Sequence, residues 1–191
     1  MHRKKGVRYM YGGGGNTSLV NPPHDEMMKM LDTPDGGVPK GLFFFADSDL
    51  GAVSRYCVYA FLNGAPIWGK SKKQHSIAVD ITDAESFAYS VAAVMAEVLR
   101  GRLEDVGFMR AILEATLICT DNDATLRIAS DAASAKRALF ILRRLGHTRH
   151  LTELDVIKAK KIARAFNVAD AGTHYCTKDV FLAFDKKLRN M

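Results

Sequence analysis

From residue 41 onward, hydrophobic residues form short runs that are separated by turn-forming residues. The first run lies within Gly41–Asp49 and contains three phenylalanines, which favours a buried β-strand. A second run spans Tyr56–Leu62, and a third begins at Pro66–Gly69. Asn63-Gly64 lies between them and is a strong signal for a tight β-hairpin. The pattern therefore predicts three strands in an antiparallel meander.

A helical period follows the third strand. Thr82-Asp83-Ala84-Glu85 matches a capping box and predicts a helix that runs to about Arg100. Its hydrophobic positions recur at helical spacing and should pack on the sheet, namely Phe87, Val91, Val94, Met95 and Val98. Glu85 has two interpretations here. It is either the capping-box partner of Thr82, or a carboxylate that meets Asp47 across the sheet.

The second half of the chain repeats the alternation of strand and helix. Leu117–Thr120 predicts a short buried strand, and Ala124–Ala129 begins a helix behind it. Apolar positions between Ala135 and Leu145 predict another helix, with a basic polar side. These elements indicate one α/β domain over residues 41–191. Residues 1–40, which include a run of four glycines, are expected to form a separate N-terminal arm.

Acidic residues stand where two of the predicted strands end. Asp47 and Asp49 share a face at the exit of the first strand, and Asp121 follows the strand at Leu117–Thr120. A buried carboxylate is costly unless it is paired or binds a metal. Two interpretations are open for the first pair: an Asp-rich turn, or a metal ligand at a strand end.

Composition and charge indicate the kind of partner and the cellular compartment. The chain has 191 residues, 48% hydrophobic content and a net charge of +6, which mildly favours a polyanionic partner such as nucleic acid. Cys57, Cys119 and Cys176 lie far apart, which matches neither a zinc site nor a disulfide framework and suggests a reducing compartment. We see no secretion signal and no apolar run that could span a membrane. An intracellular location, cytoplasmic or nuclear, is expected.

The order of elements and four short strings together resemble a known family. Asp47-Ser48-Asp49, Ser71-Lys72-Lys73-Gln74, Thr82–Glu85 and Cys119-Thr120-Asp121-Asn122 occur in the order found in the ribonuclease H domain of copia-type LTR retrotransposon polyproteins. Those domains typically carry Asp-x-Asp, Ser-Lys-Lys-Gln, Thr-Glu-Ala-Glu and Cys-Asp-Asn. The resemblance covers roughly residues 41 to 180.

The resemblance implies an α/β, ribonuclease H-like fold, with a mixed five-stranded sheet whose first three strands are antiparallel and which is flanked by helices. It also implies a metal-dependent endonuclease that hydrolyses the RNA strand of RNA–DNA hybrids by a two-metal reaction with Mg²⁺, for which Mn²⁺ can substitute. A reverse transcriptase domain or subunit is an implied partner. The arm at residues 1–40 would then be a remnant of the connection to the polymerase.

The same resemblance assigns roles to individual residues. The metal ligands would be Asp47, Glu85 and Asp121. The 2′-hydroxyl of the RNA would be contacted by Asn122, which follows a ligand in sequence. Backbone phosphates would be contacted by basic side chains near the acids, namely Arg55, Lys72 and Lys73.

This chain departs from the family's pattern at the position of the last acid. Counting back from Thr177-Lys178 places His174 in the slot of the fourth catalytic acid, with Asp170 one helical turn earlier. Either residue is a candidate for the fourth catalytic group. The change also leaves an alternative open, in which the chain is a catalytically impaired or repurposed ribonuclease H-like module that binds nucleic acid or serves a structural role. An integrase or a junction nuclease fits the strings less well.

Overall fold

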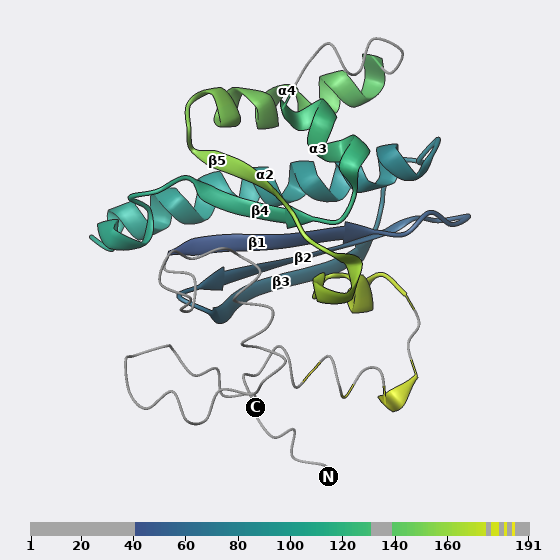
Figure 1. Cartoon of the computed structure of the whole chain (residues 1–191), viewed down its shortest axis with the longest axis horizontal. Helices are drawn as coiled ribbons and strands as arrows, with labels where there is room; N and C mark the ends of the chain where they lie inside the picture. Colours follow the sequence, from purple (N-terminus) through teal and green to yellow (C-terminus); the bar gives the residue numbers. More distant parts are fainter. Residues whose placement is uncertain (1–40, 131–138, 175–176, 180–181, 183–184, 186–191) are drawn as a thin grey trace.

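The computed structural model describes residues 41–130, 139–174, 177–179, 182 and 185 (Figure 1). The expected N-terminal arm at residues 1–40 and the predicted start of the last helix, within residues 131–138, lie outside the described part of the chain.

A five-stranded sheet forms the centre of the molecule (Figure 1). The strands lie in the order β3-β2-β1-β4-β5. β1 pairs antiparallel with β2, and β2 antiparallel with β3, whereas β4 runs parallel to β1 and β5 parallel to β4. The predicted meander and the predicted mixed sheet are both confirmed. The bounds are Leu42–Ser48 for β1, Arg55–Leu62 for β2, Ala65–Lys73 for β3, Thr116–Thr120 for β4 and Ile157–Lys161 for β5.

The turn between β2 and β3 is the predicted Asn-Gly hairpin. Asn63 and Gly64 have φ angles of 50° and 83°, a left-handed pair that Asn and Gly tolerate best. The Asn63 side chain also accepts a hydrogen bond from the backbone N–H of Gly41 at 2.8 Å. This turn therefore fixes the hairpin register and also holds the entrance to β1.

Helices cover one face of the sheet. The long helix α2 (Ile81–Asp105) packs against β1 and β2, and α3 (Asp123–Ser130) and α4 (Leu139–Glu153) lie beside it (Figure 1). Short 3₁₀ helices also lie in the described structure, η2 at Met109–Ala111, η4 at Arg164–Phe166 and η5 at Asp170–Gly172. No helix in these described ranges is both long and apolar enough to cross a lipid bilayer.

Alternation along β1 supplies two hydrophobic cores. Leu42, Phe44 and Ala46 face α2, which approaches closely through a row of buried alanines at Ala84, Ala88, Ala92 and Ala96. Phe43 and Phe45 point to the other face, which is covered by the segment that contains η4 and η5. β1 is buried along its whole length, because both faces of the sheet are covered at this strand.

The start of α2 differs from the predicted capping box. The helix begins two residues earlier than the capping box predicts, at Ile81, and its N-cap is Asp80, whose side chain accepts from the backbone N–H of Asp83 at 2.8 Å. Thr82 therefore does not cap the helix, and Glu85 is not its capping partner. The side chain of Glu85 is consequently available for the sheet side of the helix.

Candidate active site

Three acidic side chains come together at one edge of the sheet. Carboxylate oxygens of Asp47, Glu85 and Asp121 all lie within 4.8 Å of one another. Asp47 is the second-last residue of β1, Asp121 directly follows β4, and Glu85 lies near the start of α2. The structure thus places these three residues as the strand-end interpretation requires, and a shared cation would lie within reach of all three.

The topology explains this convergence. β1 and β4 are parallel neighbours, so their carboxyl ends meet at the same edge of the sheet. The start of α2 is tied to that edge by Gln74, whose Nε2 donates to Ser48 Oγ at 2.7 Å and to the Ala84 carbonyl at 3.1 Å. Gln74 therefore holds the turn of α2 that carries Glu85 against the end of β1.

Asp47 is buried, and its pKa is raised from 3.8 to about 7, first because burial penalises the charged form. A hydrogen bond from Thr173 opposes this rise, while the nearby charges of Asp121 and Asp170 add to it. At neutral pH, Asp47 would therefore be close to its titration point without a neighbouring cation.

Burial likewise raises the pKa of Glu85, to about 9, and the negative charges of Asp47 and Asp121 increase the effect. Its Oε2 is buried and has no hydrogen-bond partner among the residues that the structure describes. An unpartnered buried carboxylate oxygen is costly. Three carboxylates with an unsatisfied oxygen provide the oxygen-rich ligand set that Mg²⁺ and Mn²⁺ prefer, so the residues present fit a divalent cation.

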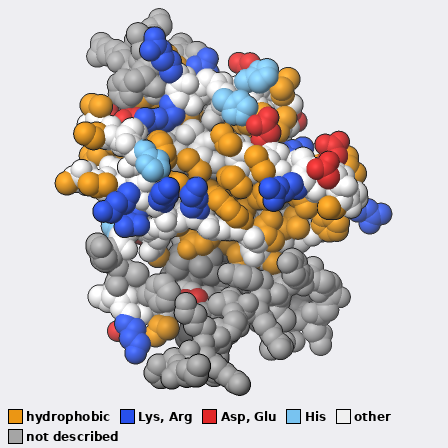
Figure 2. All heavy atoms as spheres, turned by 180° about the vertical axis from the view of Figure 1, so that it is seen from behind, with side chains coloured by type: hydrophobic (Ala, Val, Ile, Leu, Met, Phe, Trp, Pro, Cys, Tyr) orange, Lys and Arg blue, Asp and Glu red, His pale blue; other side chains and the backbone are white. Residues whose placement is uncertain are grey.

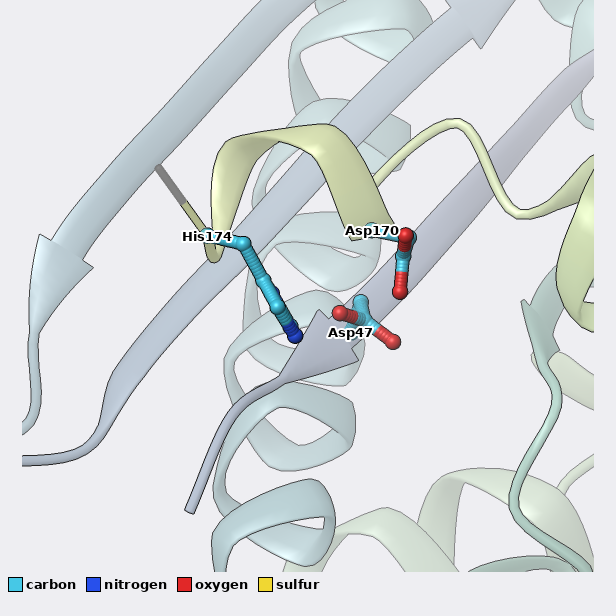
Figure 3. A group of neighbouring side chains, drawn as sticks. All are labelled: Asp47, Asp170 and His174. Carbon is cyan, nitrogen blue, oxygen red and sulfur yellow. The ribbon is translucent and has the colours of Figure 1, made fainter. Parts of the chain in front are cut away.

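Asp170 and His174 approach the cluster from the opposite face of the sheet. Figure 3 shows Asp170 on η5 and His174 just beyond it, both directed toward Asp47 at the end of β1. Ligand atoms of the three residues lie within 4.8 Å of one another. The sequence left a choice between Asp170 and His174 for the fourth position, and the structure brings both to Asp47.

Thr173 connects His174 to the cluster. Its buried Oγ1 lies 2.8 Å from Asp47 Oδ2, 2.6 Å from His174 Nδ1 and 2.8 Å from the Asp170 carbonyl. A hydroxyl carries one proton, so it donates to only one of these groups at a time. When it donates to Asp47, it can accept a hydrogen bond from His174, and the imidazole then reaches the carboxylate through a single hydroxyl.

The cluster opens into a pocket of about 460 Å³ that Leu50, Ile81, Asn122 and Arg164 help to line. Arg164 pairs with Asp170, with Nη2 3.2 Å from Oδ1. The pKa of Arg164 is raised, first by the charge of Asp170 and also by Asp121 and Asp47. The arginine thus brings a fixed positive charge to the rim of an acidic pocket.

Asp49 has a different role from Asp47. Its carboxylate accepts from the backbone N–H of Arg55, and its own N–H donates to the Arg55 carbonyl at 3.0 Å. The residue therefore closes the turn between β1 and β2. Of the two interpretations offered for this acidic pair, the turn describes Asp49 and the strand-end cluster describes Asp47.

The residues predicted to contact nucleic acid lie around this edge. Arg55 begins β2 opposite Lys73, and Lys72 and Lys73 are exposed near the end of β3. Asn122 lines the pocket, and its Oδ1 caps α3 by accepting from the Thr125 N–H at 2.8 Å. Figure 2 shows that Lys and Arg side chains are interspersed with hydrophobic ones across the middle of the face turned away in Figure 1. Charge distribution alone does not single out a nucleic-acid surface.

Sequence reasoning missed Asn167, Thr173 and Arg164. Asn167 Nδ2 lies 3.2 Å from carboxylate oxygens of both Asp47 and Asp121, which are 120 and 46 residues away in sequence. No local pattern marks such a residue. Gln74 had a signal, because it ends the Ser-Lys-Lys-Gln string, but its role in holding α2 required the structure.

No protein-family model matches the chain, and no curated protein matches it. Several solved structures do. The N-terminal RNase H domain of a Mycobacterium tuberculosis protein aligns with a TM-score of 0.54 at 12% identity, covering 78% of this chain and 98% of that one. An RNase H1 isolated from compost aligns with a TM-score of 0.55 at 15% identity, covering 78% and 99%.

A second structure of the compost RNase H1 was solved in complex with an RNA/DNA hybrid and gives a TM-score of 0.54 at 13% identity, covering 73% of this chain and 99% of that one. All of these identities are low, so the likeness concerns the fold. Together with the strand order and the parallel placement of β4 and β5, these alignments show that the chain has a ribonuclease H-like fold.

Proposed function

We propose that this chain is a metal-dependent endonuclease that hydrolyses the RNA strand of RNA–DNA hybrids. The observation that carries the proposal is the convergence of Asp47, Glu85 and Asp121 within 4.8 Å at the carboxyl ends of two parallel strands. Burial, and then neighbouring negative charge, raises the pKa of Asp47 and of Glu85, and charged carboxylates so placed destabilise the fold, so a binding role accounts for them better than a structural one.

Asp47, Glu85 and Asp121 would hold the metal, with Mg²⁺ as the expected ion and Mn²⁺ as a substitute. When bound, such ions supply an activated water and offset the charge on the leaving oxygen in phosphodiester hydrolysis. The chain's own contribution is to hold the oxygen ligands in one place. The specific atom that supports this assignment is Oε2 of Glu85, which has no hydrogen-bond partner within the described part of the chain.

Asp170 and His174 both serve the fourth position in this proposal. Asp170 lies beside Asp47 and is oriented by Arg164, so it adds negative charge at the rim of the cluster. His174 is exposed and hydrogen-bonded to Thr173, so its imidazole can exchange a proton with solvent close to Asp47. We assign Asp170 the role of adding negative charge beside Asp47, and His174 the role of transferring a proton.

The substrate assignment rests on two supports. The string resemblance points to the ribonuclease H domain of copia-type retrotransposons, and one neighbour of the same fold binds an RNA/DNA hybrid. In this chain, Asn122 lines the pocket beside Asp121 and is the candidate contact to the 2′-hydroxyl. The candidate phosphate contacts are Arg55, Lys72 and Lys73.

A retroelement origin, with a reverse transcriptase domain or subunit as a partner, follows from the same strings. Residues 1–40 would be the remnant of a polymerase connection, joined to a ribonuclease H-like domain at residues 41–191. The buried free thiols of Cys57 and Cys119 are consistent with the intracellular setting that we propose, cytoplasmic or nuclear.

A cleavage assay tests the activity. The full chain is incubated with Mg²⁺ and three duplexes of one sequence, RNA–DNA, RNA–RNA and DNA–DNA, with each strand labelled in turn. We expect cleavage of the RNA strand of the hybrid alone, lost with EDTA and strongly reduced in Asp47→Asn. Binding of the hybrid without cleavage would instead favour a catalytically impaired or repurposed nucleic-acid-binding module.

A further inference from the structure

Asn167 is the buried polar residue that joins two of the acidic side chains. Only 4% of it is exposed, and its Nδ2 lies 3.2 Å from Asp47 Oδ1, from Asp121 Oδ1 and from the Ala46 carbonyl. Its Oδ1 accepts from the backbone N–H of Ala169 at 3.2 Å. Because that N–H can only donate, the amide oxygen must face it, and the NH₂ group must face the carboxylates.

The amide of Asn167 affects the neighbouring carboxylates differently from the way a positively charged side chain would. Lys or Arg between Asp47 and Asp121 would neutralise them and compete with a metal ion. The NH₂ group of Asn167 donates hydrogen bonds without adding a full charge, so it can orient the two carboxylates and leave their attraction for a cation intact. Each carboxylate oxygen has a second lone pair that remains usable.

Thr173 holds Asp47 from the same segment. Its Oγ1 lies 2.8 Å from Asp47 Oδ2, while Asn167 contacts Oδ1, so one short segment contacts both oxygens of this carboxylate. We call Asn167 and Thr173 together the Asp47 clamp.

The segment that carries the Asp47 clamp is anchored to the sheet. Val168 and Ala169 are buried against the core around Phe45 and Cys57. Gly172 lies so close to Cys57 that an added Cβ would come within 2.2 Å of its Sγ. Its carbonyl also accepts from Ser71 Oγ at 2.6 Å. A rigidly seated segment can impose one orientation on the carboxylates that it contacts.

We propose that Asn167 is a positioning residue, which with Thr173 fixes the orientation of Asp47 and its spacing from Asp121 before a divalent cation binds. This inference rests on the proposed role of the two carboxylates as metal ligands. Partners that orient metal ligands typically contribute about 10- to 100-fold to metal affinity.

The test measures Mn²⁺ binding to the full chain by electron paramagnetic resonance, which does not depend on turnover. Asn167→Leu keeps the number and branching of the side-chain heavy atoms but removes the whole amide group, including the oxygen that accepts from Ala169, and Thr173→Val keeps the shape and removes the hydroxyl. The matched control is Thr116→Val, which removes a buried hydrogen-bonding group, 3.0 Å from Arg100, at the opposite end of β4 from Asp121.

We expect Asn167→Leu to weaken Mn²⁺ binding by about 10- to 100-fold, Thr173→Val to weaken it less, and Thr116→Val to leave it unchanged. Mn²⁺ affinity within twofold of wild type in Asn167→Leu would overturn the inference, and if that variant does not fold, the same result in Thr173→Val would do so. A wild-type chain that shows no saturable Mn²⁺ binding would overturn the proposed function itself, which separates the two failures.

Discussion

Asp47 receives contacts from both sides of the sheet. Glu85 and Asp121 approach it from α2 and β4, and Asp170, Thr173 and His174 approach it from the segment around η5. The first set supplies negative charge that only a cation can offset well. The second set contains an exposed imidazole, which supplies a group able to carry protons. Separate functions for the two sets can be tested one residue at a time.

His174→Ala should slow hybrid cleavage by roughly tenfold or more, since general acid–base groups contribute at least that much, while hybrid affinity changes little. The His174 imidazole is linked to Asp47 by the Thr173 hydroxyl, and it contacts none of the residues assigned to substrate binding. Single-turnover rates and hybrid dissociation constants measured on the same preparations separate the two effects.

His174→Asp is the companion variant, since it places an acid where copia-type ribonuclease H domains, which the strings resemble, carry one, and it should keep most of the activity. A His174→Ala chain that cleaves at the wild-type rate would show that Asp170 alone fills the fourth position. Asp170→Asn would then be the variant that slows cleavage.

At the scale of elements, the exit of β3 is the proposed contact with the nucleic-acid backbone. Lys72 and Lys73 are exposed there, in register with Tyr56 and Arg55 on β2. Replacing both lysines by alanine should reduce the slope of log affinity against log salt by about 1 to 2, because each phosphate contact releases counterions.

The matched control also replaces two basic residues by alanine, but at positions far from the exit of β3. They are Arg102 near the end of α2 and Lys158 in β5. This control should leave the salt slope unchanged while altering the net charge equally. If both double variants give the wild-type slope in filter-binding or fluorescence titrations, the β3 edge is only a solvated surface.

Local sequence pattern was sufficient to predict the first strands of the sheet and the hairpin that joins two of them. The phenylalanines of β1 and the Asn63-Gly64 turn are each signals that span only a few residues, and the structure confirms both. The fifth strand is implied by the resemblance, but no local pattern locates β5, because lysines dominate Ile157–Lys161 and leave two apolar positions, as is common for an edge strand. The helix start at Asp80 was missed because Thr82 offers an equally good capping pattern three residues before Glu85.

The candidate site was predictable only where local pattern marks its residues. Acids that end strands are visible in sequence, which points to Asp47 and Asp121, and the first turn of the predicted helix offers Glu85, a choice that the string resemblance supports. Asn167 and Thr173 act through hydrogen bonds that span more than a hundred residues to Asp47. Such contacts depend on how the η5 segment packs on the sheet, which no local pattern encodes.

At the scale of the whole molecule, the acidic cluster should couple stability to pH. Burial raises the pKa of Asp47 to about 7 and that of Glu85 to about 9, so both are protonated more readily when folded than when unfolded. Their stabilising contribution is therefore complete at acidic pH, below the unfolded values, and is lost as pH rises through about 7 and then about 9.

Melting temperatures of the metal-free chain should accordingly fall between pH 5 and pH 9 relative to those of an Asp47→Asn, Glu85→Gln double variant. The double variant lacks these titrations and so controls for all other groups. Parallel curves for the two proteins would show that the carboxyls do not limit stability.

Saturating Mn²⁺ should raise the wild-type melting temperature by roughly 5–10 °C at pH 8, and by less at pH 5.

The most direct test of the central claim is crystallographic. Crystals of the full chain soaked in Mn²⁺ at neutral pH or above would be measured at a wavelength where manganese scatters anomalously. We predict an anomalous peak between Asp47, Glu85 and Asp121, with Asn167 still contacting two of these carboxylates. A map without a peak there at saturating Mn²⁺, while the three side chains remain in place, would contradict the account.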